Sequence, residues 1–592
     1  MFFTNFANTI NFSIPIYLLT SVLTFMSNDN ISDAFKLTAQ LLELHDANPF
    51  KVKGYIGAIY QIDKLAETLN DKTTHELGRM GFTANMAAKI IELCEKNTLT
   101  ELDELLAKTP ETLLEVLKIK GLGAKKVQVL WKELQIESIE QLADACQNNS
   151  VAQLKGFGEK TQANILAEIS FVVGNAKKLR YDKAEKIVNV LLEEFQKTSY
   201  CEKVEVVGEY RRCLEIITTL QFVVATIDVA NCKKYIHESI AEIIEVPQNS
   251  GIFVWRGVVL PNQMPLEFHF VKPENFVNQV FLLSAAETHL TTVLPIGKSL
   301  LQLIRAKNFS TEEEIYKAAN LPFIAVEMRE GLGEITKAIQ NKLPNLIIYK
   351  DLQGAIHNHS TYSDGKNTLE EMLLACKSMG LQYFGISDHS QTAVYANGLS
   401  PARIQGQHAE IDALNIKYAP FKILKGIESD ILGDGSLDYE NDVLQSFDYV
   451  VASVHSNLKM DVETATKRLI TAIENPYTTI LGHATGRLLL KRQGYPLDYQ
   501  AVIEACAKNN VVIEINASPH RLDLDWRWID YALQCGVLLS INPDAHNTAS
   551  LAYMHYGVLM GRKGGLTKEK TLNCMNLEQI EEFLKARKLN IL

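Results

Sequence analysis

From Gly354 onward, short apolar segments alternate with stretches of helical periodicity. Seven segments have the length and composition of buried strands: 354–356, 383–387, 423–427, 449–454, 479–482, 511–515 and 538–541. Between the first two, Thr368 and Glu371 form a capping box ahead of an apolar helix face, and Gly380 is placed to end that helix. Strands joined by helices run parallel, so the pattern predicts an α/β domain, and a closed barrel is its simplest arrangement.

Residues of metal-binding type follow six of these seven segments. They are His357, His359 and Asp364 after the first, His389 after the second, Glu428 after the third, His455 after the fourth, His483 after the fifth, and Asp544 and His546 after the seventh. Because the carboxyl ends of parallel barrel strands converge on one face, we expect these nine residues to meet in one pocket. Imidazole and carboxylate donors suit two or three divalent ions such as Mn²⁺, Zn²⁺ or Fe²⁺.

A single histidine at a strand end is most often only a hydrogen-bonded residue, so the metal interpretation rests on the whole set. His408, His520 and His555 do not follow an expected strand, and we expect them to have no metal-binding role.

The same segments carry a family resemblance. HNHSTYSDG, GISDHSQTAVYANGL, SVHS, GHATGRLL, EINASPHRLDLDW and PDAH, together with Glu428, resemble the PHP (polymerase and histidinol phosphatase) domain of bacterial family X DNA polymerases over nearly all of 351–592. The resemblance implies a distorted (β/α)₇ barrel that hydrolyses phosphoesters with metal ions, and specifically 3′→5′ exonuclease and related 3′-end or abasic-site processing of DNA, often with Mn²⁺. Arg487 and Arg521 could clamp a phosphate, although a surface ion pair explains either equally well.

Two Gly-x-Gly turns lie between helical stretches in the first third of the chain, in LKIKGLGAKKVQVLWKEL (117–134) and LKGFGEKTQANIL (154–166). Helix amides after such a turn can face a phosphate, and lysines follow both turns. The turns resemble helix-hairpin-helix motifs, which bind DNA backbones without sequence preference, whereas one turn alone would only suggest a helix cap. The residues expected to bind DNA are Gly121, Gly123, Lys125, Lys126, Gly156, Gly158 and Lys160.

An earlier, weaker copy of this motif spans 79–91 and has Thr83 where the second glycine belongs. This copy therefore departs from the motif at the position of its phosphate contact. Lys89 stands where family X polymerases can carry a Schiff-base lysine, but an ordinary solvated helix lysine is the preferred interpretation.

The middle of the chain resembles the palm of family X polymerases without its catalytic carboxylates. In VEVVGEYRRCLEIITTLQFVVAT (204–226) the Gly, both Arg and the Glu of the pattern are present, but Glu209 replaces a serine. Thr219 and Gln221 stand where two aspartates belong, and the third carboxylate falls on Glu267. Nucleotidyl transfer needs carboxylates to hold two Mg²⁺ ions, so we expect a polymerase-like fold that is catalytically inactive.

A chain of 592 residues should fold as several domains. We expect a leader that is not part of the native protein at 1–25, or less favourably a membrane anchor, a helical DNA-binding region at 26–174, an α+β palm and thumb at 175–335, a linker at 336–353 and the metal-dependent domain at 354–592. The net charge of −11 means that DNA must be held by local basic patches, and nine cysteines without a C-x-x-C pair suit a reducing cytoplasm.

The expected function is a metal-dependent DNA phosphodiesterase that processes 3′ ends in DNA repair. It has DNA as its partner and does not act on a membrane, and the sequence leaves open whether it is a monomer. The alternatives are an active family X repair polymerase with an attached exonuclease, a small-molecule PHP phosphatase, and a noncatalytic DNA-binding scaffold. The hairpin turns disfavour the phosphatase, and the complete set of ligand residues disfavours the scaffold.

Overall fold

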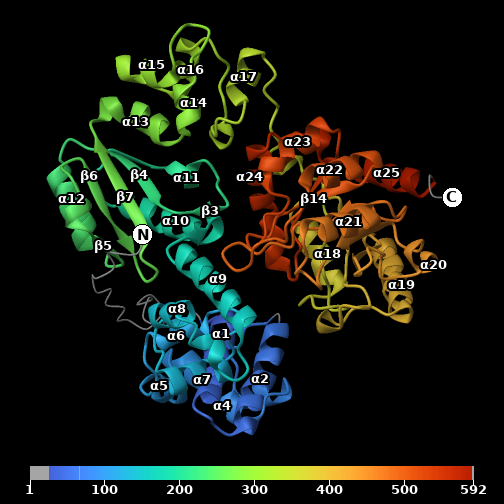
Figure 1. Cartoon of the computed structure of the whole chain (residues 1–592). Coiled ribbons are helices and arrows are strands. Elements are labelled where there is room, and N and C mark those ends of the chain that lie inside the picture. The colour runs from blue at the N-terminus through green and yellow to red at the C-terminus, as the bar shows by residue number, and fades with distance from the viewer. Residues whose placement is uncertain (1–25, 66, 590–592) are drawn as a thin grey trace. The chain divides into compact units, whose positions relative to one another are not determined.

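The computed structural model describes residues 26–65 and 67–589, in two compact units that divide at Ala176 and Lys177 (Figure 1). The expected leader at 1–25 lies outside the described residues. No helix in the described part of the chain combines the length and the apolar character needed to cross a bilayer.

The first unit is helical throughout its described residues, as the sequence predicts. Its helices are α1 (Asn28–Leu44), α2 (Pro49–Lys64), α3 (Thr74–Arg79), α4 (Ala84–Lys96), α5 (Thr100–Leu106), α6 (Leu113–Leu117), α7 (Ala124–Leu134), α8 (Ile139–Gln147) and α9 (Glu159–Asn175). Their apolar faces bury one common core, in which Phe35 meets Tyr55 edge to face at 5.0 Å between ring centroids.

The second unit begins with a mixed sheet. Its elements are β1 (Leu179–Arg180), α10 (Tyr181–Gln196), β2 (Lys203–Val207), α11 (Gly208–Arg211), β3 (Ile216–Ile217), β4 (Leu220–Ala225), α12 (Val229–Ser239), β5 (Ile243–Glu245), β6 (Val254–Val259) and β7 (Met264–Val271). The main sheet has the order β2-β4-β7-β6-β5, and within it only β4 and β7 are parallel. The strands expected at 204–207 and 220–226 are present, but the one expected at 251–255 starts only at Val254, because a turn from Gly251 to Val254 precedes it.

A helical group follows this sheet: α13 (Phe276–Leu283), α14 (Glu287–Thr291), α15 (Leu300–Ala306), α16 (Glu312–Ala318) and α17 (Glu334–Ile339). These helices pack around their own small core. The segment expected to be a linker is not a loose connection, because α17 extends into it and Ile347 is fully buried, with its N–H donating to the Leu566 carbonyl at 3.0 Å.

The C-terminal part contains every strand that the sequence predicts. Its elements are β8 (Gly354–Ala355), α18 (Leu369–Ser378), β9 (Tyr383–Gly385), α19 (Pro401–Tyr418), β10 (Lys422–Leu424), β11 (Gly426–Asp430), α20 (Asn441–Leu444), β12 (Tyr449–Ser453), α21 (Val462–Ile473), β13 (Ile480–Leu481), α22 (Tyr499–Lys508), β14 (Val512–Asn516), α23 (Ile529–Gln534), β15 (Leu539–Asn542), α24 (Met554–Lys563) and α25 (Leu577–Leu589). All neighbouring strands are parallel. The predicted capping box of Thr368 and Glu371 starts α18.

The prediction of one closed barrel is wrong, because the strands do not pair into a single sheet. The strands form two parallel sheets, β10-β9-β8 and β11-β12-β13-β14-β15, which single bridges join at His389 to Glu428 and at Asn358 to Ala545. The third expected strand divides at Lys425, whose N–H donates to the Asp448 carboxylate at 2.8 Å, so the chain changes partner from β9 to β12.

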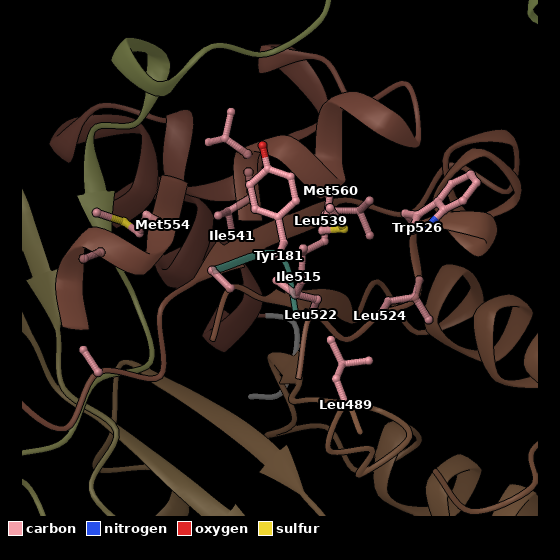
Figure 2. Close-up of a cluster of buried hydrophobic side chains, with 14 of the residues drawn as sticks. Tyr181, Leu489, Ile515, Leu522, Leu524, Trp526, Leu539, Ile541, Met554 and Met560 are labelled. Atoms are coloured by element: carbon pink, nitrogen blue, oxygen red, sulfur yellow. The ribbon is translucent and has the colours of Figure 1, made fainter. Parts of the chain in front are cut away.

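One continuous hydrophobic core joins the palm-like sheet to the C-terminal part. Figure 2 shows Tyr181 of α10 among side chains that come from β14, β15 and α24. Its ring stacks on Tyr210 at 4.6 Å between centroids and meets Tyr556 of α24 edge to face at 6.2 Å. The region from Lys177 onward therefore folds as one unit.

Candidate metal centre and DNA-binding elements

The structure brings together all nine residues that the sequence singles out at the strand ends. They form four overlapping groups: His359, Asp364, His389 and His546; His357, Glu428 and His483; His357, His359 and Asp544; and His389, Glu428 and His455. Within each group, potential ligand atoms lie within 4.8 Å of one another. His408, His520 and His555 belong to none of the groups found among the described residues.

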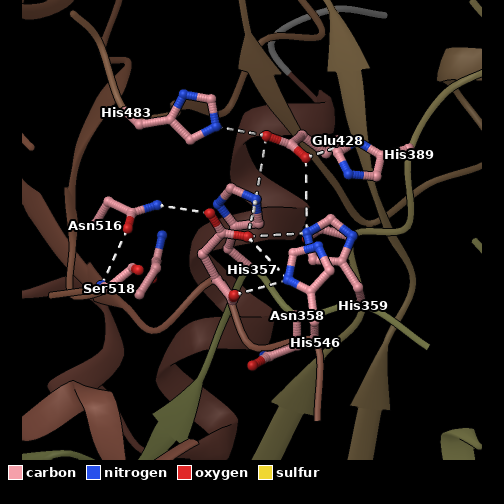
Figure 3. Close-up of polar contacts among 12 residues, drawn as sticks. His357, Asn358, His359, His389, Glu428, His483, Asn516, Ser518 and His546 are labelled. Carbon is pink, nitrogen blue, oxygen red and sulfur yellow. Dashed lines mark hydrogen bonds and ion pairs between the residues drawn. The ribbon is translucent and has the colours of Figure 1, made fainter. Parts of the chain in front are cut away.

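Glu428, at the centre of β11, is the hub of the cluster, and Figure 3 shows it between the rings of His389 and His483. Its two oxygens face five imidazole nitrogens: Oε1 lies 2.9 Å from His483 Nε2, 3.2 Å from His455 Nε2 and 3.3 Å from His357 Nε2, and Oε2 lies 3.0 Å from His389 Nδ1 and 3.7 Å from His359 Nε2. Burial raises the pKa of the Glu428 carboxyl, but the surrounding histidines, His455 foremost, hold it well below its usual range. Glu428 is therefore ionised.

The opposite end of the cluster is open to solvent. Asp364 Oδ1 lies 3.4 Å from His546 Nε2, and these two side chains are 33% and 35% exposed, whereas His357, His359 and Glu428 are buried. A ligand can therefore reach the cluster from the side of Asp364 and His546.

The donor set fits divalent ions. Four buried ring nitrogens of the cluster have no aligned hydrogen-bond partner among the described residues: His357 Nε2, His359 Nδ1, His389 Nδ1 and His483 Nδ1. Buried polar atoms without a partner are costly, and lone pairs of imidazole together with carboxylate oxygens are the ligands of borderline metal ions. The cluster is thus suited to binding divalent metal.

Two carboxylates that the sequence analysis missed hold histidines in place. Glu514 Oε2 lies 2.5 Å from His357 Nδ1, and Asp430 Oδ1 lies 2.5 Å from His455 Nδ1. Such contacts keep the proton on Nδ1 and leave Nε2 free to face the cluster. A signal was available, because Asp430 stands two residues after Glu428 on β11 and so projects to the same face of the strand.

The two arginines expected to clamp a phosphate have different environments. Arg521 Nε lies 3.6 Å from Asp544 Oδ2, at the edge of the cluster. Arg487 instead donates through Nε to the Arg521 carbonyl at 2.9 Å, through Nη1 to Asp525 at 2.6 Å, and through Nη2 to the Leu522 carbonyl. Arg487 thus holds the backbone of the loop that carries Arg521, and its own donors are occupied.

In the palm-like sheet, protein groups surround the remaining carboxylate. Gln221 lies directly opposite Glu267 in the pairing of β4 with β7, and its Nε2 donates to Glu267 Oε2 at 2.8 Å. Arg256 Nε donates to Oε1 at 2.7 Å, and His269 Nε2 lies 3.0 Å from Oε2. The hydrogen bond with His269, opposed by burial, lowers the pKa of Glu267 to about 2.

Glu209, which replaces the expected serine, is also engaged by the protein. Its carboxylate accepts from the N–H of Thr218 at 2.5 Å and of Thr219 at 3.4 Å. Within the described residues, every group of three or more side chains that could hold a metal ion lies in the C-terminal cluster and none in this sheet.

The two hairpin turns of the first unit lead into helices whose N-termini have no side-chain cap. Gly123 and Gly158 cap α7 and α9 without a side-chain hydrogen bond, and a Cβ at either glycine would meet no atom within 4 Å. Gly158 needs its lack of a side chain, because its φ is +93°. Lys125 and Lys160 are exposed beside these turns.

The earlier copy of the motif, at 79–91, differs because a side chain caps its second helix. Thr83 caps α4 with its own side chain, which accepts from the Met86 N–H at 3.3 Å, so this amide already has a protein partner. Lys89 is not a solvated helix lysine as expected: its side chain is largely buried and paired with Glu101, whose carboxylate also accepts from the Tyr55 hydroxyl at 2.7 Å.

Comparisons with known proteins agree with this division. The family model described as "PHP domain" matches residues 355–518, and the model described as "SAM-like Helix-hairpin-helix tandem" matches residues 113–170. "DNA polymerase/3′-5′ exonuclease PolX" of Bacillus subtilis (strain 168) is 33% identical over 574 residues, which cover 95% of this chain and 100% of that protein.

Shorter relatives match only the C-terminal part. A protein described as "Probable phosphatase" from Thermoanaerobacter sp. (strain X514) is 28% identical over 247 residues, covering 40% of this chain and 95% of that protein. One of the same description from Shewanella sediminis (strain HAW-EB3) is 28% identical over 246 residues, covering 39% of this chain and 93% of its own length. Since its similarity to the Bacillus protein runs through nearly the whole length of both, the chain belongs to the PolX family.

Proposed function

We propose that this protein is a metal-dependent 3′→5′ DNA exonuclease that processes 3′ ends in DNA repair, and that its reaction takes place at the cluster around Glu428. The observation that carries the proposal is the convergence of six histidines and three carboxylates, in which four buried ring nitrogens have no aligned hydrogen-bond partner among the described residues. The nine residues would hold two or three divalent ions, with Mn²⁺ or Zn²⁺ favoured over Fe²⁺.

Bound ions at such a site activate water and neutralise the charge on phosphate oxygens. The protein's own groups orient the site. Glu514 and Asp430 fix the rings of His357 and His455, and Arg521 offers donors to a nonbridging phosphate oxygen. The open side at Asp364 and His546 admits the DNA end.

The first unit delivers the DNA. The uncapped amides at Gly123 and Gly158 and the nearby lysines bind backbone phosphates without reading bases. The nine cysteines are all free, which suits action in the reducing cytoplasm.

We further propose that the palm-like sheet does not catalyse nucleotidyl transfer. Both oxygens of Glu267 already contact protein groups, namely Gln221, Arg256 and His269, which would compete with an ion. The two arginines of the motif are also occupied: Arg211 pairs with Glu312 at 2.8 Å, and Arg212 pairs with Glu330 at 3.0 Å.

Small-molecule phosphatase activity is the second candidate, because relatives described as probable phosphatases match the C-terminal part over most of their length. The tandem hairpins at 113–170 favour DNA as the substrate.

The test is to measure bound metal and DNA degradation together, with purified protein and 5′-labelled single-stranded DNA in Mn²⁺. Asp544→Ala and His455→Ala should each lose metal and nearly all release of 3′ nucleotides. The exposed Glu202→Ala, which lies in the palm-like part, is the matched control and should behave as wild type. Undiminished degradation by both variants, or hydrolysis of small phosphomonoesters alone, would refute the proposal.

A further inference from the structure

The loop that follows His389 exposes two apolar side chains beside the metal cluster. Val394 and Tyr395 are 82% and 69% exposed, in a short helical turn at Val394–Ala396. The ring of Tyr395 lies 6.1 Å from the ring of His389, centroid to centroid, with an angle of 57° between their planes. An aromatic surface is thus displayed next to one of the nine cluster residues.

Several contacts hold this loop in place, so the exposure of Val394 and Tyr395 is a property of the folded loop. Its ends are bridged between Ser390 and Leu399, and a Cβ on Gly398 would lie only 1.8 Å from the Ser390 carbonyl oxygen. Thr392 donates its N–H to Asp438 at 2.7 Å and its hydroxyl to Asp430 at 3.0 Å.

The loop is also tied to the cluster by a shared carboxylate, because Asp430 holds His455 as well as Thr392. The residues on either side of Val394 and Tyr395 in the sequence, Ala393 and Ala396, are buried. The backbone therefore fixes Tyr395 at a set position relative to the cluster.

We propose that Tyr395 stacks on the 3′-terminal nucleobase of a DNA strand whose scissile phosphate lies at the cluster. The inference rests on the proposed function and adds the contact by which the terminal nucleotide is held. A base attached to a phosphate at the cluster lies within reach of the ring, and aromatic rings at nucleic-acid sites bind bases by stacking, whatever the base.

The experiment compares two 5′-labelled single-stranded oligonucleotides in Mn²⁺ that differ only at the 3′-terminal residue, which is either a normal nucleotide or an abasic tetrahydrofuran. Tyr395→Ala should reduce kcat/KM for removing the normal nucleotide roughly tenfold, the size of one base–aromatic stack, and change removal of the abasic residue little. Tyr395→Phe and Tyr395→Trp should keep the wild-type preference. Ile416→Ala, which removes another exposed apolar side chain, on α19, is the control and should change neither rate.

Equal loss on both substrates would show a structural role for Tyr395 and overturn the proposal. Rates for both substrates that equal those of wild type would also overturn it. A second readout does not depend on activity: with 2-aminopurine at the 3′ end and Ca²⁺ in place of Mn²⁺, the bound fluorophore should be quenched by wild type and less by Tyr395→Ala. Equal quenching by both, or none by wild type when DNA is bound, would refute stacking. If quenching depends on Tyr395 but no nucleotide is released in Mn²⁺, the contact stands and the proposed exonuclease function fails.

Discussion

The indole Nε1 of Trp526 donates a hydrogen bond of 2.9 Å to Oε2 of Glu215. The other carboxylate oxygen of Glu215 accepts from Arg527 at 2.8 Å. Glu215 belongs to the palm-like part, whereas Trp526 and Arg527 end the loop that carries Arg521 to the cluster. A residue that matches the polymerase motif thus anchors a loop of the candidate nuclease centre.

Glu215→Ala should destabilise the second unit, because it leaves the Trp526 N–H and the Arg527 guanidinium without their buried partner. The cost should be about 1 to 3 kcal/mol in the free energy of unfolding. Thermal unfolding measured beside Glu202→Ala, an exposed carboxylate of the same part, checks it. A midpoint equal to that of the control would mean that the contact contributes nothing.

Arg521 and Arg487 should respond differently to replacement by alanine. Arg521→Ala should keep the wild-type thermal midpoint and lower kcat by about a hundredfold, as expected for one lost donor to a reacting phosphate. Arg487→Ala should lower both, because Arg487 supports the backbone of the same loop. Steady-state kinetics and thermal unfolding of both variants decide this. If Arg487→Ala loses only activity, Arg487 contacts the substrate after all.

The strand-end residues could be predicted because the sequence signal is local: each histidine or carboxylate follows an apolar segment. Parallel strands then bring their carboxyl ends, and these residues, to one face. The contact from Glu215 to Trp526 joins residues 311 positions apart, and no local pattern announces it. The same holds for Arg487, whose partners were fixed only by the path of the loop. The division of the third strand at Lys425 depends on Asp448 of a later segment, so periodicity alone could not place it.

Stability should fall in mild acid because of His289. This side chain is fully buried, with Nδ1 2.7 Å from Glu334 and Nε2 2.9 Å from the Tyr316 hydroxyl. Burial lowers the pKa of His289, with Glu334 opposing, so the unfolded chain takes up a proton first as the pH falls. The stability that neutral His289 contributes is thus fully present above the ordinary histidine pKa of about 6.5. It is lost below that pH, by at most about 1.4 kcal/mol per pH unit.

The check is denaturant unfolding between pH 8 and pH 5 of wild type, His289→Gln and the exposed-residue control His237→Gln. The slope of stability against pH should be shallower for His289→Gln than for the other two. Identical slopes for all three proteins would exclude His289 as the source.

DNA affinity should depend on the hairpin lysines. Changing Lys125 and Lys126 together to Glu should weaken binding equally for all sequences and flatten the dependence of log affinity on log salt by about one to two units, because fewer phosphates are neutralised. Titrations of two unrelated oligonucleotides at several salt concentrations measure this, with Lys234→Glu in the palm-like part as the control. A loss confined to one sequence would contradict backbone binding.

The central claim is that this chain shortens DNA at the cluster around Glu428 and does not extend it at the palm-like sheet. The most direct measurement follows one 5′-labelled primer on a template, with Mn²⁺ and all four deoxynucleotides present, for wild type and His455→Ala. The account predicts progressive shortening by wild type, an unchanged primer with His455→Ala, and a longer product with neither. Template-directed extension by His455→Ala would show that Thr219, Gln221 and Glu267 still support nucleotidyl transfer, and equal shortening by both proteins would place the nuclease elsewhere.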